Sequence, residues 1–166
     1  TVASLGKDVN LGATFKFVGK DSLKYEAENG VFNKAVLEST HEGFSGKGYA
    51  NLDNEVGSSL TLSVVAADEG DKDVKIVFAN GSTANRPVSV AVNGKVQVES
   101  VDFESTGAWE SWDSSTVTLR LPAGASAITI ASLTKDGGPN IDRIEFVNKN
   151  AVIPVNPGDS VVGDSG

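Results

Sequence analysis

Apolar and polar residues alternate along most of the middle of the chain. The alternation is clear in the runs "SLTLSVVAA", "DVKIVFANG", "TVTLRLPAG" and "SAITIASL". Because successive side chains of a strand point to opposite faces, each run places its apolar residues on one face. These apolar positions are Leu60, Leu62, Val64, Val74, Ile76, Phe78, Val117, Leu119, Leu121, Ile128 and Ile130. The pattern predicts half-buried strands, and no long segment shows a sustained helical period.

The stretch "VSVAVNGKVQVESVDF" predicts a β-hairpin. Apolar residues alternate on both sides of the dipeptide Asn93-Gly94, at Val88, Val90, Val92, Val96 and Val98. Asn-Gly favours a tight hairpin turn because both residues accept a positive φ. Asn80-Gly81 is a second turn signal, and "NIDRIEFV" supplies a last strand. Short strands separated by turns are typical of an antiparallel β-sandwich or barrel.

The two ends of the chain differ from this middle part. Residues 1–23 contain "VNLGATFKF", whose alternation predicts either an extra strand of the domain or the last strand of an upstream module. Residues 148–166 carry two prolines among small and polar residues, which predicts a C-terminal linker. We therefore expect one folded domain over residues 24–147.

The net charge of the chain argues against two classes of binding partner. Lys and Arg number 14 and Asp and Glu number 22, so the formal net charge is -8. Surfaces that bind nucleic acid or anionic membranes are basic, so neither partner is expected, whereas cation binding suits the acidic balance. No stretch approaches the roughly 20 apolar residues of a membrane span, and without cysteine there is no thiolate metal site or disulfide.

The residues give little support to an enzyme. The lone histidine, His41, lies in the polar, glycine-rich stretch "STHEGFSGKGY", where a solvated side chain is the favoured interpretation. Nucleophile-elbow, phosphate-loop and zinc-protease motifs do not occur in the sequence. Glu26 and Glu28 could suggest glycoside hydrolysis, but that reaction needs two carboxyl groups facing each other across a substrate. Two residues on one face of one strand do not provide this arrangement.

The same two glutamates fit a metal better. In "YEAENG", Glu26 and Glu28 would share one strand face, and Asp142 in "GPNIDRIEF" would join them if the last strand pairs beside the first. Ca²⁺ takes six to eight oxygen ligands, commonly carboxylates and backbone carbonyls. An exposed acidic pair is the competing interpretation, and the spacing alone leaves both open.

Aromatic residues supply candidate ligand contacts. Trp109 and Trp112 both fall in the polar run "STGAWESWDSST", and Tyr49 follows a glycine-rich turn in "GKGYANLD". An aromatic ring beside polar residues in a loop suits stacking on the apolar face of a sugar. The alternative is that the rings close one end of the sandwich or belong to its core.

Taken in order, the motifs resemble those of carbohydrate-binding modules of family 35 and the related family 6. They are "YEAENG", "FSGKGYANL", "VFANG", "RPVSVAVNG", "TGAWESW", "VTLRLPAG" and "GPNIDRIEF", and they cover about residues 24–147. The resemblance implies an all-β fold, an antiparallel β-sandwich of the jelly-roll type. It also implies a non-catalytic part of a secreted enzyme that acts on plant cell-wall or other polysaccharides.

The resemblance implies a structural Ca²⁺ site. Its ligands would be Glu26, Glu28 and Asp142, with backbone oxygens near Ser45 to Lys47. A divalent cation would offset the repulsion between the carboxylates and join the first strand to the last. A second Ca²⁺ at the sugar site is left open by the loop acids Glu42 and Asp53.

The resemblance also implies a sugar site in loops at one end of the sandwich. It would use Tyr49, Asn140 and one of Trp109 and Trp112, of which we favour Trp112. Arg86 in "NRPVSV" matches an arginine near this site. Its guanidinium could pair with the carboxylate of a uronic acid, or it could be structural.

Together these observations predict a monomeric carbohydrate-binding module, without catalytic residues, that is covalently linked to a secreted enzyme. Its ligand would be a polysaccharide or oligosaccharide containing uronic acid, galactose or mannose. The alternative is a structural or protein-interaction β-sandwich within a large extracellular protein.

Overall fold

The computed structural model describes residues 23–147. The predicted N-terminal extension, apart from residue 23, and the predicted linker over 148–166 lie outside the described residues. Within them the chain forms eleven strands and one turn of 3₁₀ helix, η1 (Ala27–Asn29). None of the described helical segments is long and apolar enough to cross a membrane.

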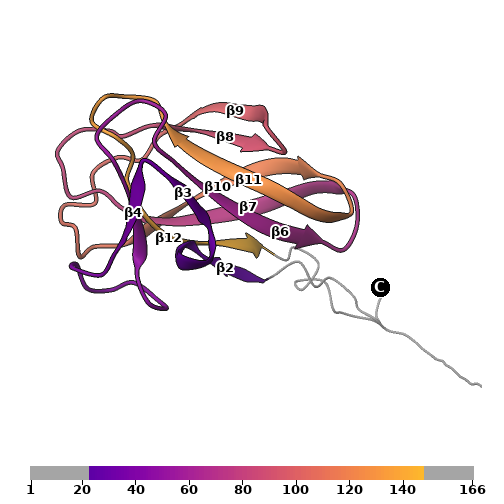
Figure 1. Cartoon of the computed structure of the whole chain (residues 1–166), viewed down its shortest axis with the longest axis horizontal. Helices are drawn as coiled ribbons and strands as arrows, with labels where there is room; N and C mark the ends of the chain where they lie inside the picture. Colours follow the sequence, from indigo (N-terminus) through magenta and orange to yellow (C-terminus); the bar gives the residue numbers. More distant parts are fainter. Residues whose placement is uncertain (1–22, 148–166) are drawn as a thin grey trace, which may run out of the picture. The chain divides into compact units, whose positions relative to one another are not determined.

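The strands form two antiparallel sheets (Figure 1). The first sheet runs in the order β10 (Asp113–Leu121), β7 (Gly70–Ala79), β12 (Asn140–Val147), β5 (Tyr49–Leu52) and β4 (Ala35–Glu38), and β2 (Lys24–Glu26) also pairs with β12. The second sheet runs in the order β3 (Val31–Asn33), β6 (Ser59–Ala66), β11 (Gly124–Ser132), β8 (Val88–Val92) and β9 (Lys95–Val101). From β5 to β12, successive strands alternate between the sheets, except at the hairpin β8–β9. The predicted β-sandwich is confirmed.

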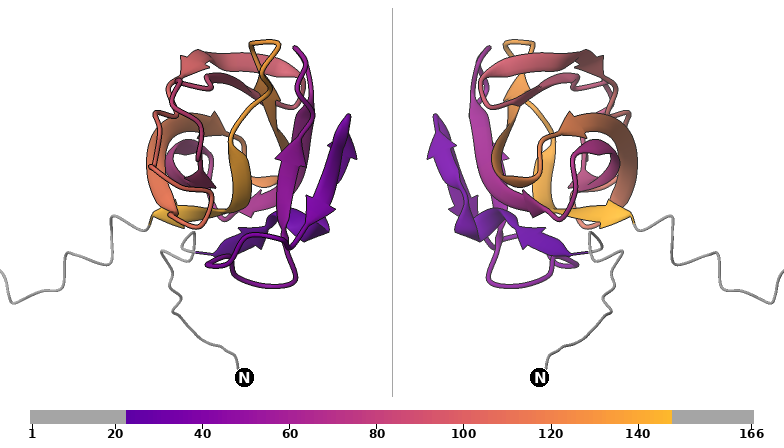
Figure 2. Two further views of the ribbon diagram at one scale, coloured as in Figure 1. Left: turned by 90° about the vertical axis from the view of Figure 1, so that its left-hand side faces the viewer. Right: turned by 90° about the vertical axis from the view of Figure 1, so that its right-hand side faces the viewer.

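The core lies between the two sheets, which face each other when the sandwich is seen end on (Figure 2). Alternate residues of β6 and β8 are buried there, as are those of β7 from Val74, of β10 from Val117 and of β11 from Ser126, as the alternation predicts. Burying these aliphatic and aromatic side chains is the main favourable term that holds the sheets together, at about 25 cal/mol per Å² of apolar surface. Within this core the rings of Phe78 and Phe103 pack against each other at a centroid distance of 4.4 Å with an interplanar angle of 55°.

The predicted hairpin is confirmed at Asn93-Gly94. Both residues have positive φ, 51° and 84°, which is the backbone of a tight type I′ connection. Irregularities in the pairing of β8 with β9 interrupt the alternation of the second strand. As a result Val98 packs against the core whereas Val96 is 52% exposed.

The expectation that Glu26 and Glu28 share one strand face is wrong. Strand β2 ends at Glu26, and the chain then turns through η1, where the N–H of Gly30 donates to the carbonyl of Ala27. The turn is required because β2 belongs to the first sheet and β3 to the second, so the chain must cross between them. Ala27 is fully buried at this crossing. Glu28 therefore lies in η1 and not in a strand. From there its side chain contacts the loop that contains Lys47 and Gly48.

A β-bulge in β12 sets the geometry of the last strand. Ile141 pairs with Phe78 and Arg143 with Val77, so Asp142 is an extra residue on β12. The bulge buries Asp142 completely and turns Arg143 to the outer face of the sheet. A bulge commonly re-aims a side chain in this way.

Candidate functional site

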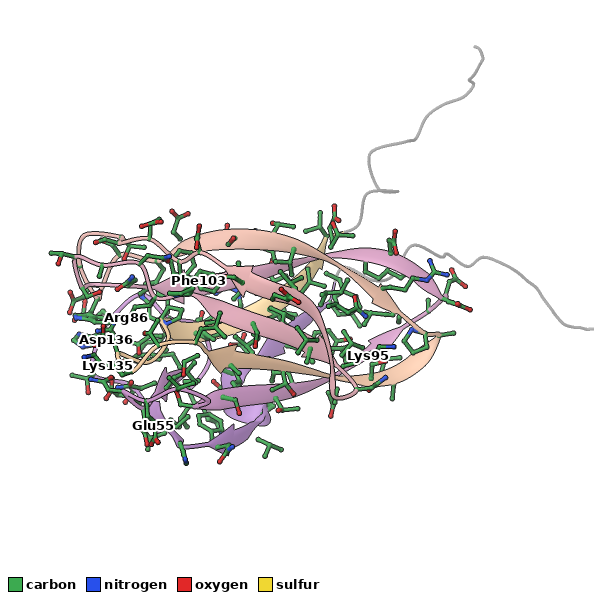
Figure 3. All side chains as sticks on the ribbon, turned by 90° about the horizontal axis from the view of Figure 1, so that it is seen from above. Glu55, Arg86, Lys95, Phe103, Lys135 and Asp136 are labelled. Carbon is green, nitrogen blue, oxygen red and sulfur yellow. The ribbon has the colours of Figure 1, made fainter. Side chains whose placement is uncertain are left out.

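A pocket of about 160 Å³ opens among loops at one end of the sandwich. We call it the Arg86 pocket; Arg86 lies at the same end as Lys135 and Asp136 (Figure 3). Its lining combines one indole, one imidazole and several amide and charged groups, from Glu38, His41, Asn51, Asn54, Arg86, Trp109 and Asn140. This mixture of an aromatic surface with hydrogen-bonding groups suits a small polar ligand.

Arg86 is the cation of this pocket. Its guanidinium carbon lies 5.2 Å from the centroid of the Trp109 ring, and Nη1 donates to the carbonyl of Gly138 at 3.4 Å. Nε is buried and has no hydrogen-bond partner among the described residues. Within the same part of the chain Arg86 forms no ion pair. The pocket therefore contains a guanidinium without an ion-pair partner among the described residues, and the carboxylate of Glu38, which also lines the pocket, is hydrogen-bonded to Tyr49 and Asn51.

Trp109 is placed by the turn that the sequence predicts at Asn80-Gly81. The side chain of Asn80 is buried and donates to the carbonyls of Ala84 and Phe103 at 2.8 Å each, which fixes the loop. Gly81 lies so close to the indole that a Cβ added there would be 2.5 Å from the ring. A glycine at this position thus allows the indole to lie flat against the backbone.

Glu38 lines the pocket and is bound by the neighbouring Tyr49. Glu38 accepts hydrogen bonds from the Tyr49 hydroxyl at 2.6 Å and from Asn51 Nδ2 at 3.1 Å. The Tyr49 side chain is fully buried, and burial together with the bond to Glu38 raises its pKa to about 12. Tyr49 is not among the residues that line this pocket, and its expected contact with a ligand stays a prediction. In the structure Tyr49 supports the pocket by holding Glu38.

Asn140 and His41 complete the lining. Asn140, a predicted ligand residue, pairs directly with Asn51 across β12 and β5, so two amides lie side by side. His41 was expected to be solvated, but it stacks on Trp109 at 6.1 Å and on Tyr49 at 6.4 Å. Its Nδ1 lies 2.8 Å from a carboxylate oxygen of Glu110. No motif pointed to His41, because these contacts come from loops far apart in the sequence.

Trp112 does not belong to the Arg86 pocket. Its Nε1 donates to the carbonyl of Glu42 at 2.8 Å, and its ring packs edge-on against Tyr49 at 5.3 Å. It borders a separate groove with Lys75 and Arg143. Trp109 is the tryptophan that lines a pocket with Arg86 and Asn140, and the expected preference for Trp112 as the sugar contact stays a prediction. Neither Glu42 nor Asp53 lines the Arg86 pocket.

A cluster of carboxylates gathers around the loop that contains Ser45. The Ser45 hydroxyl oxygen lies 2.9 and 3.0 Å from the two carboxylate oxygens of Glu26 and 3.0 Å from Oδ2 of Asp142. One hydroxyl proton can serve only one of these acceptors at a time. The backbone N–H of Ser45 also donates to Asp142 Oδ2 at 2.9 Å. Two of the three predicted metal carboxylates therefore converge on one side chain.

Glu28 reaches the same loop from η1. Its Oε1 accepts from the backbone N–H of Lys47 at 2.7 Å and of Gly48 at 3.2 Å. The loop thus offers N–H donors to the carboxylates at these positions, whereas the resemblance implies backbone oxygens as metal ligands. Among the described residues, no group of three or more acidic or histidine side chains is arranged to hold a metal ion.

Arg143 balances part of this negative charge. Its Nη1 donates to Asp142 Oδ2 at 2.5 Å, and its Nε donates to Glu145 at 2.6 Å. Burial acts to lower the pKa of Arg143, but the bonds and charges of Glu145 and Asp142 raise it overall. Burial acts to raise the pKa of Glu145, and Arg143 lowers it overall. Oδ1 of Asp142 remains buried without a hydrogen-bond partner among the described residues.

Comparison with known proteins places the chain beside carbohydrate-active enzymes. The family model described as "Carbohydrate binding module (family 35)" matches residues 23–147. An exo-beta-D-glucosaminidase of Amycolatopsis orientalis is 40% identical over 124 residues, and endo-1,4-beta-xylanase B of Cellvibrio japonicus is 34% identical over 127 residues. Each match covers 75% of this chain, but only 12% and 21% of those two relatives.

Solved structures give the same result. A family 35 carbohydrate-binding module from Clostridium thermocellum has a TM-score of 0.74 and 36% identity, and the match covers 76% of this chain and 97% of that one. A structure described as Xyl-CBM35 in complex with a glucuronic acid containing disaccharide has a TM-score of 0.69 and 30% identity, with 76% and 93% covered.

Proposed function

The chain belongs to family 35 of the carbohydrate-binding modules, and on this premise we propose that its Arg86 pocket binds a uronic-acid residue of a polysaccharide. The module itself is non-catalytic. Its relatives are enzymes that carry such a module as a small part of their length. We propose that this module likewise holds a secreted enzyme on its polysaccharide.

The unpaired guanidinium of Arg86 carries the proposal. A planar guanidinium forms two parallel hydrogen bonds to a carboxylate, which makes it the side chain best suited to a uronate. Trp109 offers an aromatic surface for the apolar face of the sugar ring, while Asn51 and Asn140 offer amide groups to its hydroxyls. A neutral galactose or mannose unit would leave Arg86 without a counter-charge.

Calorimetry with methyl glucuronide tests this function. Replacing a charged partner in a desolvated pair costs about 2–5 kcal/mol, so Arg86→Ala should weaken binding at least about 30-fold. Arg120→Ala is the matched control, because Arg120 is exposed and pairs with Glu69 and Asp71 on another part of the surface. Unchanged affinity in Arg86→Ala, or tighter binding of methyl galactoside or mannoside, would contradict the proposal.

We also propose that the carboxylate cluster holds a structural Ca²⁺. One support is Oδ1 of Asp142, which is buried and has no hydrogen-bond partner among the described residues. The other is the hydroxyl of Ser45, which lies within hydrogen-bond distance of three carboxylate oxygens. Glu26, Glu28 and Asp142 would hold the ion with the loop over Ser45 to Lys47, and the hard oxygens suit calcium. When bound, the cation would supply the positive charge that Arg143 alone does not, and it would join β2 to β12.

A second Ca²⁺ at the sugar site, for which the loop acids Glu42 and Asp53 are the candidates, stays a prediction, and neither acid lines the Arg86 pocket. Glucuronide affinity measured with and without chelator checks it, provided that the chain remains folded in both. An affinity that does not change on chelation would count against a metal in the Arg86 pocket.

A further inference from the structure

The groove beside Trp112, which we call the Trp112 groove, is not used by the proposed function. It has a volume of about 290 Å³ and is lined by Gly43, Lys75, Val77, Trp112, Asp113, Ser114 and Arg143. It therefore has its own tryptophan and its own arginine. The chain has two tryptophans: Trp109 lines the Arg86 pocket and Trp112 lines the Trp112 groove.

The strand register explains why these residues meet. Val77 of β7 pairs with Ser114 of β10 on one side and with Arg143 of β12 on the other. Paired residues on neighbouring strands point to the same face of a sheet. Because Ile76 and Phe78 face the core, Val77 and Lys75 face outward. The groove thus lies on the outer face of the first sheet, with Val77 in its floor.

Trp112 is held in place beside this floor by three contacts. Its Nε1 is bound to the carbonyl of Glu42, its ring is packed edge-on against Tyr49, and a Cβ on Gly43 would lie 2.6 Å from it. Trp112 as a whole is half-buried, and it lines the groove. An aromatic surface that is already fixed loses little conformational entropy when a ligand stacks on it.

The charges of the groove differ from those of the Arg86 pocket. Arg143 is bound to Asp142 and Glu145, and Lys75 lies 3.8 Å from Glu145. Asp113 adds a carboxylate to the lining, so both cations of the groove already have carboxylates beside them. An anionic sugar would have to displace an existing partner of Arg143 or Lys75. A neutral sugar can use the same ammonium, carboxylate and hydroxyl groups for its own hydroxyls.

We propose that the Trp112 groove is a second sugar-binding site, and that it takes neutral units of a polysaccharide. The indole of Trp112 would stack on the apolar face of a sugar ring. Lys75, Asp113 and Ser114 would form hydrogen bonds with its hydroxyls. This site is separate from the Arg86 pocket, although the loops over residues 39–48 and 102–112 border both.

The two indole N–H groups allow both sites to be followed in one experiment. Each gives its own nuclear magnetic resonance signal in the isotope-labelled full chain, and Trp109→Phe and Trp112→Phe assign them by removing one signal each. The probes are methyl glucuronide and the neutral hexasaccharides xylohexaose, mannohexaose and cellohexaose. We expect glucuronide to shift the Trp109 signal, and at least one neutral hexasaccharide to shift the Trp112 signal saturably, also in Arg86→Ala.

Lys75→Ala gives the matched test of the groove. Loss of one exposed hydrogen bond costs about 0.5–1.5 kcal/mol, so the neutral hexasaccharide should bind at least about twofold more weakly at Trp112. Its glucuronide response at Trp109 should be unchanged, which also shows that the variant is folded. Lys95→Ala, on β9 of the other sheet (Figure 3), should change neither response.

Several results would overturn the second site. These are a Trp112 signal that none of the neutral hexasaccharides moves, a Trp112 shift that disappears in Arg86→Ala, and a Lys75→Ala variant with unchanged affinity. A neutral hexasaccharide that moves only the Trp109 signal would contradict both the second site and the uronate preference of the Arg86 pocket. A failed glucuronide response at Trp109 would contradict the proposed function alone.

Discussion

The Arg86 pocket and the Trp112 groove each combine an arginine with a tryptophan, but they treat the positive charge differently. Arg86 has no carboxylate partner among the described residues, whereas Arg143 is bound to both Asp142 and Glu145. An arginine whose charge is already neutralised holds the fold together and offers little to an anion. An arginine without a carboxylate partner is available to bind an anion. The pairing of the guanidinium, more than its presence, therefore distinguishes the two surfaces.

Truncating each arginine in turn gives the largest expected contrast. Arg143→Ala would leave the fully buried Asp142 without its cation, and breaking a buried pair costs about 3–5 kcal/mol. Arg86→Ala would lose a cation–π contact of about 0.5–1 kcal/mol and one long hydrogen bond to the carbonyl of Gly138, worth at most about 1.5 kcal/mol. Urea unfolding of both variants in excess chelator measures the difference. Equal losses of stability would remove the distinction between a paired and an unpaired arginine.

Calcium should act on the Asp142 side of the molecule. An ion that binds only the folded state stabilises it by about 2.7 kcal/mol at 100 times its dissociation constant. We expect a melting temperature about 10 °C higher in excess Ca²⁺ than in chelator. Asp142→Asn should lose this response, whereas Asp113→Asn, the same change in the Trp112 groove, should keep it. A melting temperature that does not depend on calcium would contradict the metal site.

The two tryptophans should differ in their effect on glucuronide binding. Trp109→Ala removes the ring that lies beside Arg86, and stacking is worth about 0.5–1.5 kcal/mol, so affinity should fall up to about tenfold. Trp112→Ala should leave glucuronide affinity within about twofold. Calorimetry on both variants, after circular dichroism has shown that each is folded, decides the matter. A larger loss of glucuronide affinity in Trp112→Ala than in Trp109→Ala would indicate that the uronate binds beside Trp112.

The pair between Arg143 and Glu145 should give the smallest effect, visible in its dependence on pH. Because the pKa of Glu145 is lowered in the folded state, its contribution to stability is present above the unfolded value of about 4.3 and is lost as the pH falls through the folded pKa. The stability lost in Glu145→Gln should thus be largest near neutral pH and shrink in acid. Thermal unfolding from about pH 3 to 7 checks this. A constant difference would show that the charge of Glu145 is not involved.

The fold could be predicted from the sequence because alternation reports directly on burial. Val74, Ile76 and Phe78 face the core as their spacing predicts, and Asn93-Gly94 forms the expected turn. The spacing did not reveal that the chain crosses between the sheets at Ala27, so Glu28 was placed on the wrong element. It also did not reveal the bulge at Asp142, since a bulge follows from strand pairing.

The candidate site could be predicted only in part. The resemblance supplied Arg86 and Asn140, which the structure brings into one pocket. It led us to favour Trp112, whereas Trp109 lines this pocket, because the position of each ring depends on loop contacts with Gly81 and Gly43 that the sequence does not show. The burial of Tyr49 and the stacking of His41 likewise arise from contacts between loops. The sequence also does not show that Arg143 has carboxylate partners and Arg86 has none among the described residues, because these contacts form only in the folded chain.

The most direct test of the central claim compares two sugars that differ in one group. Methyl glucuronide and methyl glucoside should be titrated into the full chain in the presence of calcium, with the Trp109 indole signal as the readout. A charge-assisted bond to Arg86 is worth about 1.5–3 kcal/mol, so the glucuronide should bind at least about tenfold more tightly. Equal affinity for the two sugars at Trp109 would contradict the role that we assign to the unpaired guanidinium.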